Sequence, residues 1–397
     1  MEVPLQLLKF PELVLWSIFS VMEFEEKLDL SFCSRKSAAI VRRNSTSPIR
    51  MEISIVKHMP YIAVWHTKQP KSGRYKLFVQ KGTNGFDEND SKRNLSGVKV
   101  LGKWSPKSTI FCSVINQPTP TPPHEIFHGL LSHILQVFPN CHVESLFINF
   151  NVSKENFDVK IALPSMSTVD TVELGGSKMF TRDLVFLLQN LKIRNEFISY
   201  CQPPLQCWAQ SFGEIPKITV NPAKWVTRKM LLNLNSEVVI LHNCYFENDD
   251  LMAFFEKWKT STASDDGLMK LRFLKVDLKF ESDLLDYEKL GGVDFDYKEH
   301  LDYLSDKTKA ELNQHIATNI KRDDGMIASI FRFGVRETTA RFYGFFVWDE
   351  GIPIVVQRRP VEENPEGEGA GIQNPENEGP QEAENPGNVD DGPENEE

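Results

Sequence analysis

Residues 236–258 read SEVVILHNCYFENDDLMAFFEKW, a strand-like run followed directly by a helix-like run. The first nine residues form a short run that is rich in apolar and β-branched side chains, which is typical of a strand. The last twelve residues predict a helix that opens at Asn248, a residue type favoured at helix N-termini. This segment therefore predicts one strand followed by one helix.

The same order recurs irregularly on both sides, from about Cys141 to Leu278. Its apolar spacing is similar to that of leucine-rich repeats, in which strands line a curved sheet and helices back it. We therefore expect a βα solenoid with an extended binding face. The strands are expected in ESLFINF (144–150), TVDTVELGG (168–176), KITV (217–220) and LRFLKVDL (271–278), and further helices in TRDLVFLLQNL and TRKMLLNL, which open at Thr181 and Thr227.

Toward the C-terminus, residues 320–348 read as strands, with Asp324-Gly325 as the turn of a β hairpin. Residues 361–397 contain thirteen Asp or Glu, no Lys or Arg and no aromatic residue. This composition predicts a disordered acidic tail.

Toward the N-terminus, short β-like runs between residues 49 and 116 predict a small antiparallel meander. A polar, glycine-containing loop is expected from Lys81 to Asn94. The run QPTPTPP, residues 117–123, predicts a stiff extended linker.

The first 48 residues predict three short helices, Pro11–Met22, Glu25–Phe32 and Ser34–Arg43. The first of them, PELVLWSIFSVM, is apolar on nearly every side. So small a module cannot cover such a helix by itself, so the helix must dock either on a partner or on the following domain.

The run FPELVLWSIFSVM followed by LDLSFCSRKS resembles an F-box, which opens with an apolar residue and Pro and closes with a Leu-Ser-x-Cys-Ser-type segment. This resemblance implies binding to a Skp1-like adaptor and, through it, to a cullin. Glu25-Glu26-Lys27 and Ala38 depart from the usual F-box pattern. By analogy, the adaptor-binding residues are Phe10, Pro11, Val14, Leu15, Ile18, Phe19, Met22, Leu28 and Leu30.

Residues 200–280 resemble the type 2 F-box-associated domain of nematode F-box proteins, through Trp225-Val226-Thr227, the strand ending at Phe246, and Lys257-Trp258. Trp208 and Trp225 are interpreted either as buried packing residues or as partner contacts. The predicted fold is α+β or α/β. Its parts are an F-box (1–48), a β-rich segment (49–116), a proline-rich linker (117–123), an F-box-associated βα domain (124–360) and the acidic tail (361–397).

Composition favours protein partners. Thirteen of the 55 acidic residues lie in the tail, so the body carries 42 acidic against 45 basic residues and offers no reason to expect nucleic acid or membrane partners. The six cysteines form no CxxC pair, so neither a zinc ribbon nor a disulfide framework is indicated. We expect a cytoplasmic or nuclear protein without cofactor.

The resemblance implies a non-catalytic subunit of an SCF-type ubiquitin ligase that holds a protein target. Two alternatives stay open: a scaffold that binds a partner without ubiquitylation, and a zinc peptidase. The latter is suggested by His124-Glu125-Ile126-Phe127-His128, a match to HExxH. No third ligand is identifiable, so no metal site and no catalytic residue are predicted.

Overall fold

The chain divides into two units, residues 1–357 and 358–397, and every residue that the computed structural model describes lies in the first unit. The predicted acidic tail therefore lies outside the described residues, as does most of the predicted linker. The described residues are 9–46, 48–56, 60–66, 75–80, 91–95, 98–105, 109–114, 122–150, 158–163, 166–177, 179–202, 212–261, 267–283, 285–294, 317–333, 339–349 and 352–353.

Three helices open the described chain: α1 (Glu12–Val21), α2 (Phe24–Cys33) and α3 (Arg35–Asn44). Each matches its predicted range to within about two residues. Local chemistry sets the starts of α2 and α3, because the Glu23 amide donates to Glu26 Oε2 at 2.8 Å and the Ser37 amide donates to Ser34 Oγ at 3.0 Å. The three predicted N-terminal helices are confirmed.

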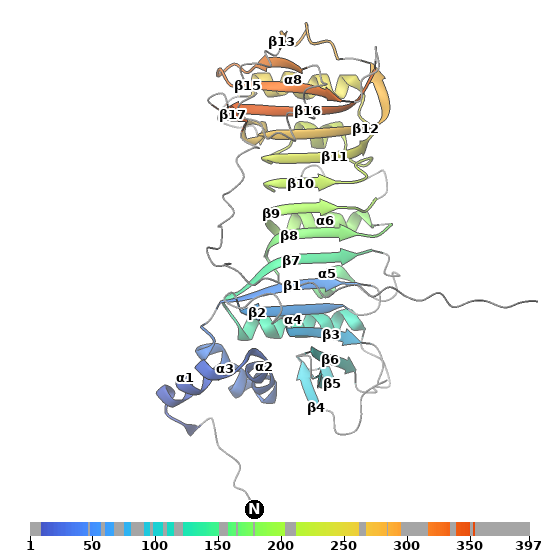
Figure 1. The fold of residues 1–397 in the computed structure, drawn as a ribbon. Coiled ribbons are helices and arrows are strands. Elements are labelled where there is room, and N and C mark those ends of the chain that lie inside the picture. Colours follow the sequence, from blue (N-terminus) through green and yellow to red (C-terminus); the bar gives the residue numbers. More distant parts are fainter. Residues whose placement is uncertain are drawn as a thin grey trace, which may run out of the picture. The chain divides into compact units, whose positions relative to one another are not determined.

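The centre of the sheet is parallel and follows chain order (Figure 1). Each strand from β8 to β12 pairs in parallel with the one before it, and β7 pairs in parallel with β1. This parallel part contains β1 (Ile49–Ile55), β7 (Cys141–Asn149), β8 (Thr168–Gly175), β9 (Lys192–Ser199), β10 (Lys217–Val220), β11 (Val238–Cys244) and β12 (Phe273–Asp283).

Residues facing one side of these strands form one continuous apolar row across the sheet. Strand register places each member beside the next, and every member is at most 1% exposed. Burial on this scale is the main source of stability in a sheet covered by helices. The row runs through Ile53, Leu146, Val172, Phe197, Ile218, Val239, Leu274 and Phe345.

The N-terminal end of the sheet contains β2 (Tyr61–His66), β3 (Tyr75–Gln80), β4 (Ser91–Leu95), β5 (Val98–Ser105) and β6 (Thr109–Val114). Strands β1, β2 and β3 are antiparallel, as are β4, β5 and β6, but β3 pairs with β6 in parallel.

The expected simple meander is therefore wrong in two respects. Strand β4 occupies residues that were expected to be loop, and β1 also pairs with β7, so residues 49–116 share their sheet with the βα part of the chain. Local periodicity carries no information about pairing between segments so far apart in sequence.

The C-terminal end contains β13 (Val293–Asp294), β14 (Ala317–Lys321), β15 (Ile327–Phe333), β16 (Thr339–Asp349) and β17 (Ile352–Pro353). Strand β16 closes the parallel part by pairing antiparallel with β12. The predicted hairpin is confirmed between β14 and β15, where Gly325 has a φ of 96° and the Arg322 amide donates to the Met326 carbonyl at 2.8 Å.

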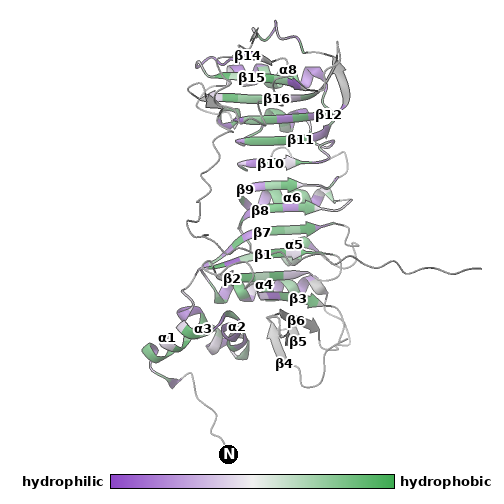
Figure 2. Ribbon diagram, in the orientation of Figure 1, coloured by the Kyte–Doolittle hydropathy of each residue, from purple (hydrophilic) through white to green (hydrophobic). Residues whose placement is uncertain are grey.

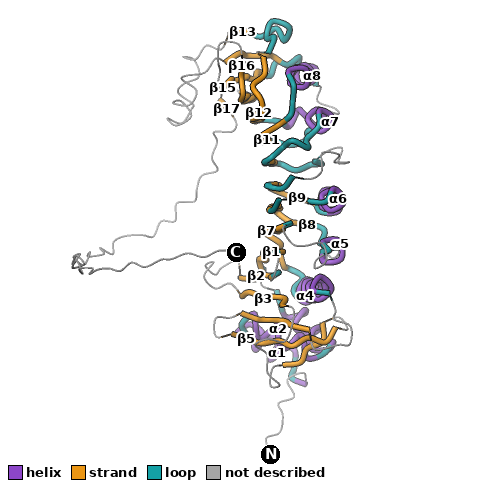
Figure 3. Tube along the Cα trace, turned by 90° about the vertical axis from the view of Figure 1, so that its right-hand side faces the viewer, coloured by secondary structure: helices purple, strands orange, loops and turns teal. Residues whose placement is uncertain are grey.

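Helices α4 (Pro123–Val137), α5 (Val159–Ala162), α6 (Thr181–Asn190), α7 (Arg228–Leu232) and α8 (Asn248–Thr260) lie along one face of the strands (Figure 3). A 3-10 helix, η3 (Gly267–Lys270), precedes β12. Helix α4 begins at Pro123, so the predicted linker ends before that residue. Within the described part of the chain, no helix is both long and apolar enough to cross a membrane.

The predicted capping residues are right at one helix and wrong at two. Thr227 Oγ1 accepts from the Met230 amide at 3.3 Å and caps α7. Thr181 and Asn248 are instead the first helical residues of α6 and α8. At α8 the cap is Glu247, whose amide donates to Asp250 Oδ2 at 3.1 Å, so a capping box begins the helix one residue earlier than expected.

An aromatic cluster fastens α8 to β16. The Phe345 ring lies 5.7, 5.6 and 5.0 Å from the rings of Phe254, Phe255 and Trp258, and all four side chains are at most 1% exposed. Such ring pairs add to the free energy gained from burial alone.

Phe345→Ala is expected to lower the free energy of unfolding by about 4 kcal/mol, because it removes a ring from this closed cluster and leaves a cavity. Urea denaturation measures the change. Phe345→Leu, which keeps most of the volume, should cost about 1 kcal/mol. Equal denaturation midpoints for the wild-type protein and Phe345→Ala would contradict this account of the cluster.

Contacts between α2, α4 and β3 join the N-terminal helices to the sheet. The Phe24 ring lies 5.5 Å from that of Tyr75 and 5.0 Å from that of Phe138, and Tyr75 Oη donates to Glu23 Oε2 at 3.1 Å. His133 of α4 stacks on the ring of Phe32 at 4.6 Å. These contacts dock α2 on α4 and β3, whereas the docking expectation concerned the first helix.

The Ser31 hydroxyl donates to the Leu28 carbonyl at 2.6 Å and lies 2.8 Å from His133 Nε2. Ser31 Oγ therefore accepts from Nε2–H, which suits a neutral imidazole. Burial lowers the pKa of His133 to about 4. Because protonation is disfavoured in the folded state, the stability contributed by neutral His133 is complete above pH 6.5 and is lost as the pH falls toward 4.

His133→Gln keeps an amide donor for Ser31 but removes the titration. We expect the wild-type protein to lose about 2 kcal/mol more stability than the variant between pH 6.5 and pH 4. Urea denaturation midpoints measured across this range test the expectation. If the denaturation midpoints of both proteins change equally with pH, burial does not keep His133 neutral.

Candidate partner-binding surfaces

Helix α1 is apolar on all of its faces, and only one of them can be buried by the rest of the chain. Its ten residues, ELVLWSIFSV, include only Glu12, Ser17 and Ser20 as polar residues. Figure 2 shows the corresponding hydrophobic colouring along the helix. The inward face of α1 is buried in the chain, whereas the outward face is exposed.

The inward face belongs to the protein's own core. Leu15 and Phe19 are 7% and 1% exposed, Leu28 of α2 is fully buried, and Met22 and Leu30 pack partly buried against the same cluster. These five residues were predicted to bind an adaptor, and in this structure they contact the chain itself. Their role in adaptor binding stays a prediction, and in this structure Leu15, Phe19 and Leu28 are not accessible to a partner.

The outward face remains open to solvent. Of the predicted residues, Phe10, Pro11 and Val14 are exposed and Ile18 is half-buried. The prediction missed Leu13 and Val21, which are about four-fifths exposed, and Trp16, which is 57% exposed. The sequence carried no signal for these residues, because the helix is apolar nearly all round; with Leu15 and Phe19 buried, the helical step of 100° per residue places Leu13 and Val21 on the opposite side. We call Phe10, Leu13, Val14, Trp16 and Val21 the α1 face.

Two further features make the α1 face suited to a protein partner. Ser17 Oγ donates to the Leu13 carbonyl at 3.0 Å and Ser20 Oγ to the Ser17 carbonyl at 2.7 Å, so both hydroxyls are satisfied within the helix. The ion pair between Arg43 and Glu12, at 3.5 Å, joins two well-exposed side chains and contributes little to the stability of the fold. Clustered exposed apolar residues of this kind mark interaction sites.

The face of the parallel sheet opposite the helices is a second candidate surface. In β7, β8 and β9, buried residues such as Val143, Val169 and Ile193 alternate with polar residues, and the polar residues lie on this open face. Figure 3 shows the helices along the other side only. The open face therefore presents polar side chains from several strands.

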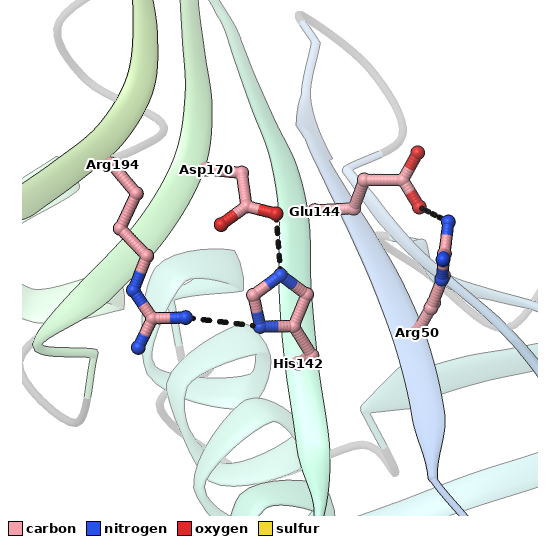
Figure 4. A network of polar contacts seen from close by, with 5 residues as sticks. All are labelled: Arg50, His142, Glu144, Asp170 and Arg194. Carbon is pink, nitrogen blue, oxygen red and sulfur yellow. Dashed lines mark hydrogen bonds and ion pairs between the residues drawn. The ribbon is translucent and has the colours of Figure 1, made fainter. Parts of the chain in front are cut away.

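A polar network crosses three of these strands (Figure 4). His142 of β7 hydrogen-bonds to Asp170 of β8 through Nε2, while Arg194 of β9 donates to His142 Nδ1 at 3.4 Å. With Nδ1 accepting, His142 carries its proton on Nε2 and donates it to the Asp170 carboxylate. Each side chain orients the next, so the network presents a fixed pattern of donors and acceptors.

Other charge pairs extend this pattern along the open face. Arg50 Nη1 of β1 donates to Glu144 Oε2 at 3.3 Å, and Lys217 Nζ of β10 lies 2.8 Å from Glu196 Oε1 of β9. Farther along, His242 of β11 lies 3.6 Å from Asp277 of β12. Asp277 is buried, but the other pairs are partly exposed; such pairs contribute little to stability and offer specific contacts to a complementary partner surface.

The HExxH residues lie in the first turns of α4, as expected from the preceding prolines. His128 Nδ1 is 3.4 Å from Ser132 Oγ, and Glu125 is exposed. Across the part of the chain that the structure describes, no three His, Cys, Asp or Glu side chains gather where they could hold a metal ion. The peptidase alternative gains no third ligand from these residues.

Of the two tryptophans considered as partner contacts, Trp225 is 1% exposed and lies 5.7 Å from the ring of Phe212, so it belongs to the core. Trp208 lies outside the described residues. Trp16, by contrast, is exposed and belongs to the α1 face.

Comparison with known proteins gives one distant relative to report. The chain is similar to the uncharacterized protein F59B2.8 of Caenorhabditis elegans, with 22% identity over 365 residues that cover 89% of this chain and 80% of that protein. No family model matches the chain, and no solved structure matches it significantly.

Proposed function

We propose that this protein is a substrate-recognition subunit of an SCF-type ubiquitin ligase, in which the α1 face binds a Skp1-like adaptor and the sheet holds a protein target. The observation that supports adaptor binding is the exposed apolar surface on α1, in the segment that resembles an F-box. A contiguous exposed apolar surface of this kind is typical of a protein-protein interaction site.

The second half of the proposal is that the βα part is a leucine-rich-repeat-like solenoid. Parallel pairing in chain order from β7 to β12, with helices along one face, supports it. Solenoids of this kind present the helix-free face of the sheet to partners. Here that face contains the His142 network and the charge pairs, which would form hydrogen bonds and ion pairs with a polar protein surface.

The proposed mechanism involves no chemistry by this chain. Holding a target close to a ubiquitin-loaded enzyme that arrives through the adaptor and a cullin raises the effective concentration of the target's lysines. The expected place of action is the cytoplasm, the nucleus or both, where the ligase components meet. No cofactor or metal is required of this chain.

Leu13→Asp and Val21→Asp in the full-length chain are expected to weaken binding to a Skp1-like adaptor at least tenfold, because each places a carboxylate in an apolar interface. Both side chains are exposed, so folding should be unaffected. Co-purification followed by calorimetric titration measures the change.

Val293→Asp is the matched control, since Val293 is 68% exposed and lies far along the chain in β13. It should bind the adaptor as the wild type does. If the wild-type chain does not bind, the ligase proposal fails and a scaffold without ubiquitylation becomes the better explanation. Equal losses for all three variants would show that the α1 face is not the specific contact.

A further inference from the structure

A hollow of about 150 Å³ lies where the N-terminal helices meet the sheet. Phe19, Phe24 and Phe138 contribute apolar walls and are each 1% exposed. Trp16 and Ser20 also line it and are exposed, so the hollow opens beside α1. An apolar cavity of comparable volume accepts a benzene molecule.

Two polar groups inside this hollow lack the partners that burial normally requires. Lys27 and Ser45 both line it and are 8% and 7% exposed. Ser45 Oγ is buried without a hydrogen-bond partner, and Lys27 makes no hydrogen bond or ion pair with the residues that the structure describes. The hollow is also lined by Ser20, Asn44 and Thr46, so its lining is part polar. A buried hydroxyl without a hydrogen bond costs free energy, which an anion bound between Ser45 and the Lys27 ammonium would recover.

The nearest carboxylates are engaged outside the hollow. Glu23 Oε2 accepts from Tyr75 Oη at 3.1 Å, and Glu26 Oε2 accepts from the Glu23 amide at 2.8 Å, so both serve the start of α2. Burial lowers the pKa of Lys27, while the charges of Glu23 and Glu26 act in the opposite direction. The ammonium group therefore lies beside negative charge without being paired to it.

From this arrangement we infer that the hollow is a binding site for a small aromatic or apolar monocarboxylate. The carboxylate would pair with Lys27 and accept a hydrogen bond from Ser45 Oγ, and the apolar body would pack against Phe19, Phe24 and Phe138. One cation matches one negative charge, which favours a monocarboxylate over a phosphate dianion. The hollow borders the α1 face, because Trp16 belongs to both, but binding of the carboxylate to Lys27 and Ser45 does not depend on the adaptor.

Benzoate and its neutral isostere benzamide are the probes, titrated into the full-length chain without adaptor by calorimetry and thermal denaturation. Benzoate is expected to bind saturably at one site and raise Tm, while benzamide binds about tenfold or more weakly. Lys27→Met should weaken benzoate binding by about the same factor. Lys36→Met, at an exposed residue of α3, should bind as the wild type does.

Lys27→Met replaces a desolvated cation with an apolar side chain of similar length, so its Tm should equal or exceed that of the wild type. Ser45→Ala, which adds no volume, gives a second reading if Lys27→Met does not fold, with an expected loss of several-fold in benzoate affinity. Absence of saturable binding, equal binding of benzoate and benzamide, or unchanged affinity in these variants would each overturn the site and show that the hollow holds only water.

Discussion

The buried row that crosses the sheet from Ile53 to Phe345 is the constraint on which the other parts of the described structure depend. Each residue in it lies beside its neighbour on the next strand, and the row faces the helices. A one-residue slip of a strand would turn its row residue to the open face and bring a neighbour into the core, for example Glu52 in β1 or Lys217 in β10. Register, helix placement and the polarity of the open face are therefore set together.

The same constraint explains why charged side chains gather on the opposite face. Because alternate residues point to opposite sides of a strand, burying Val143, Val169 and Ile193 places His142, Asp170 and Arg194 on the open side, in adjacent strands. The network in Figure 4 follows from parallel pairing of β7, β8 and β9. A surface suited to partner recognition thus arises from the alternation that builds the core.

The N-terminal helices are held by a smaller set of contacts with a different consequence. Phe24, His133 and Tyr75 anchor α2, and the inward side of α1 follows it into the core. This docking covers Leu15 and Phe19 but leaves Leu13, Trp16 and Val21 in solvent. It also leaves the hollow beside Lys27 and Ser45, since three helices meeting a sheet do not fill the corner completely.

Local patterns in the sequence were enough to predict the three N-terminal helices, the strands β7, β8, β10, β11 and β12, and the hairpin at Gly325, because capping and glycine preferences and apolar periodicity act over a few residues. They missed β9 (Lys192–Ser199) and the short helix α5. They could not predict the pairing of β1 with β7, the parallel contact of β3 with β6, or the outward-facing residues of α1. Pairing joins segments that lie far apart in the chain, so only the tertiary structure shows which strands are neighbours. A helix that is apolar nearly all round carries no periodic signal for which side faces outward, so its packing against the rest of the chain determines that side.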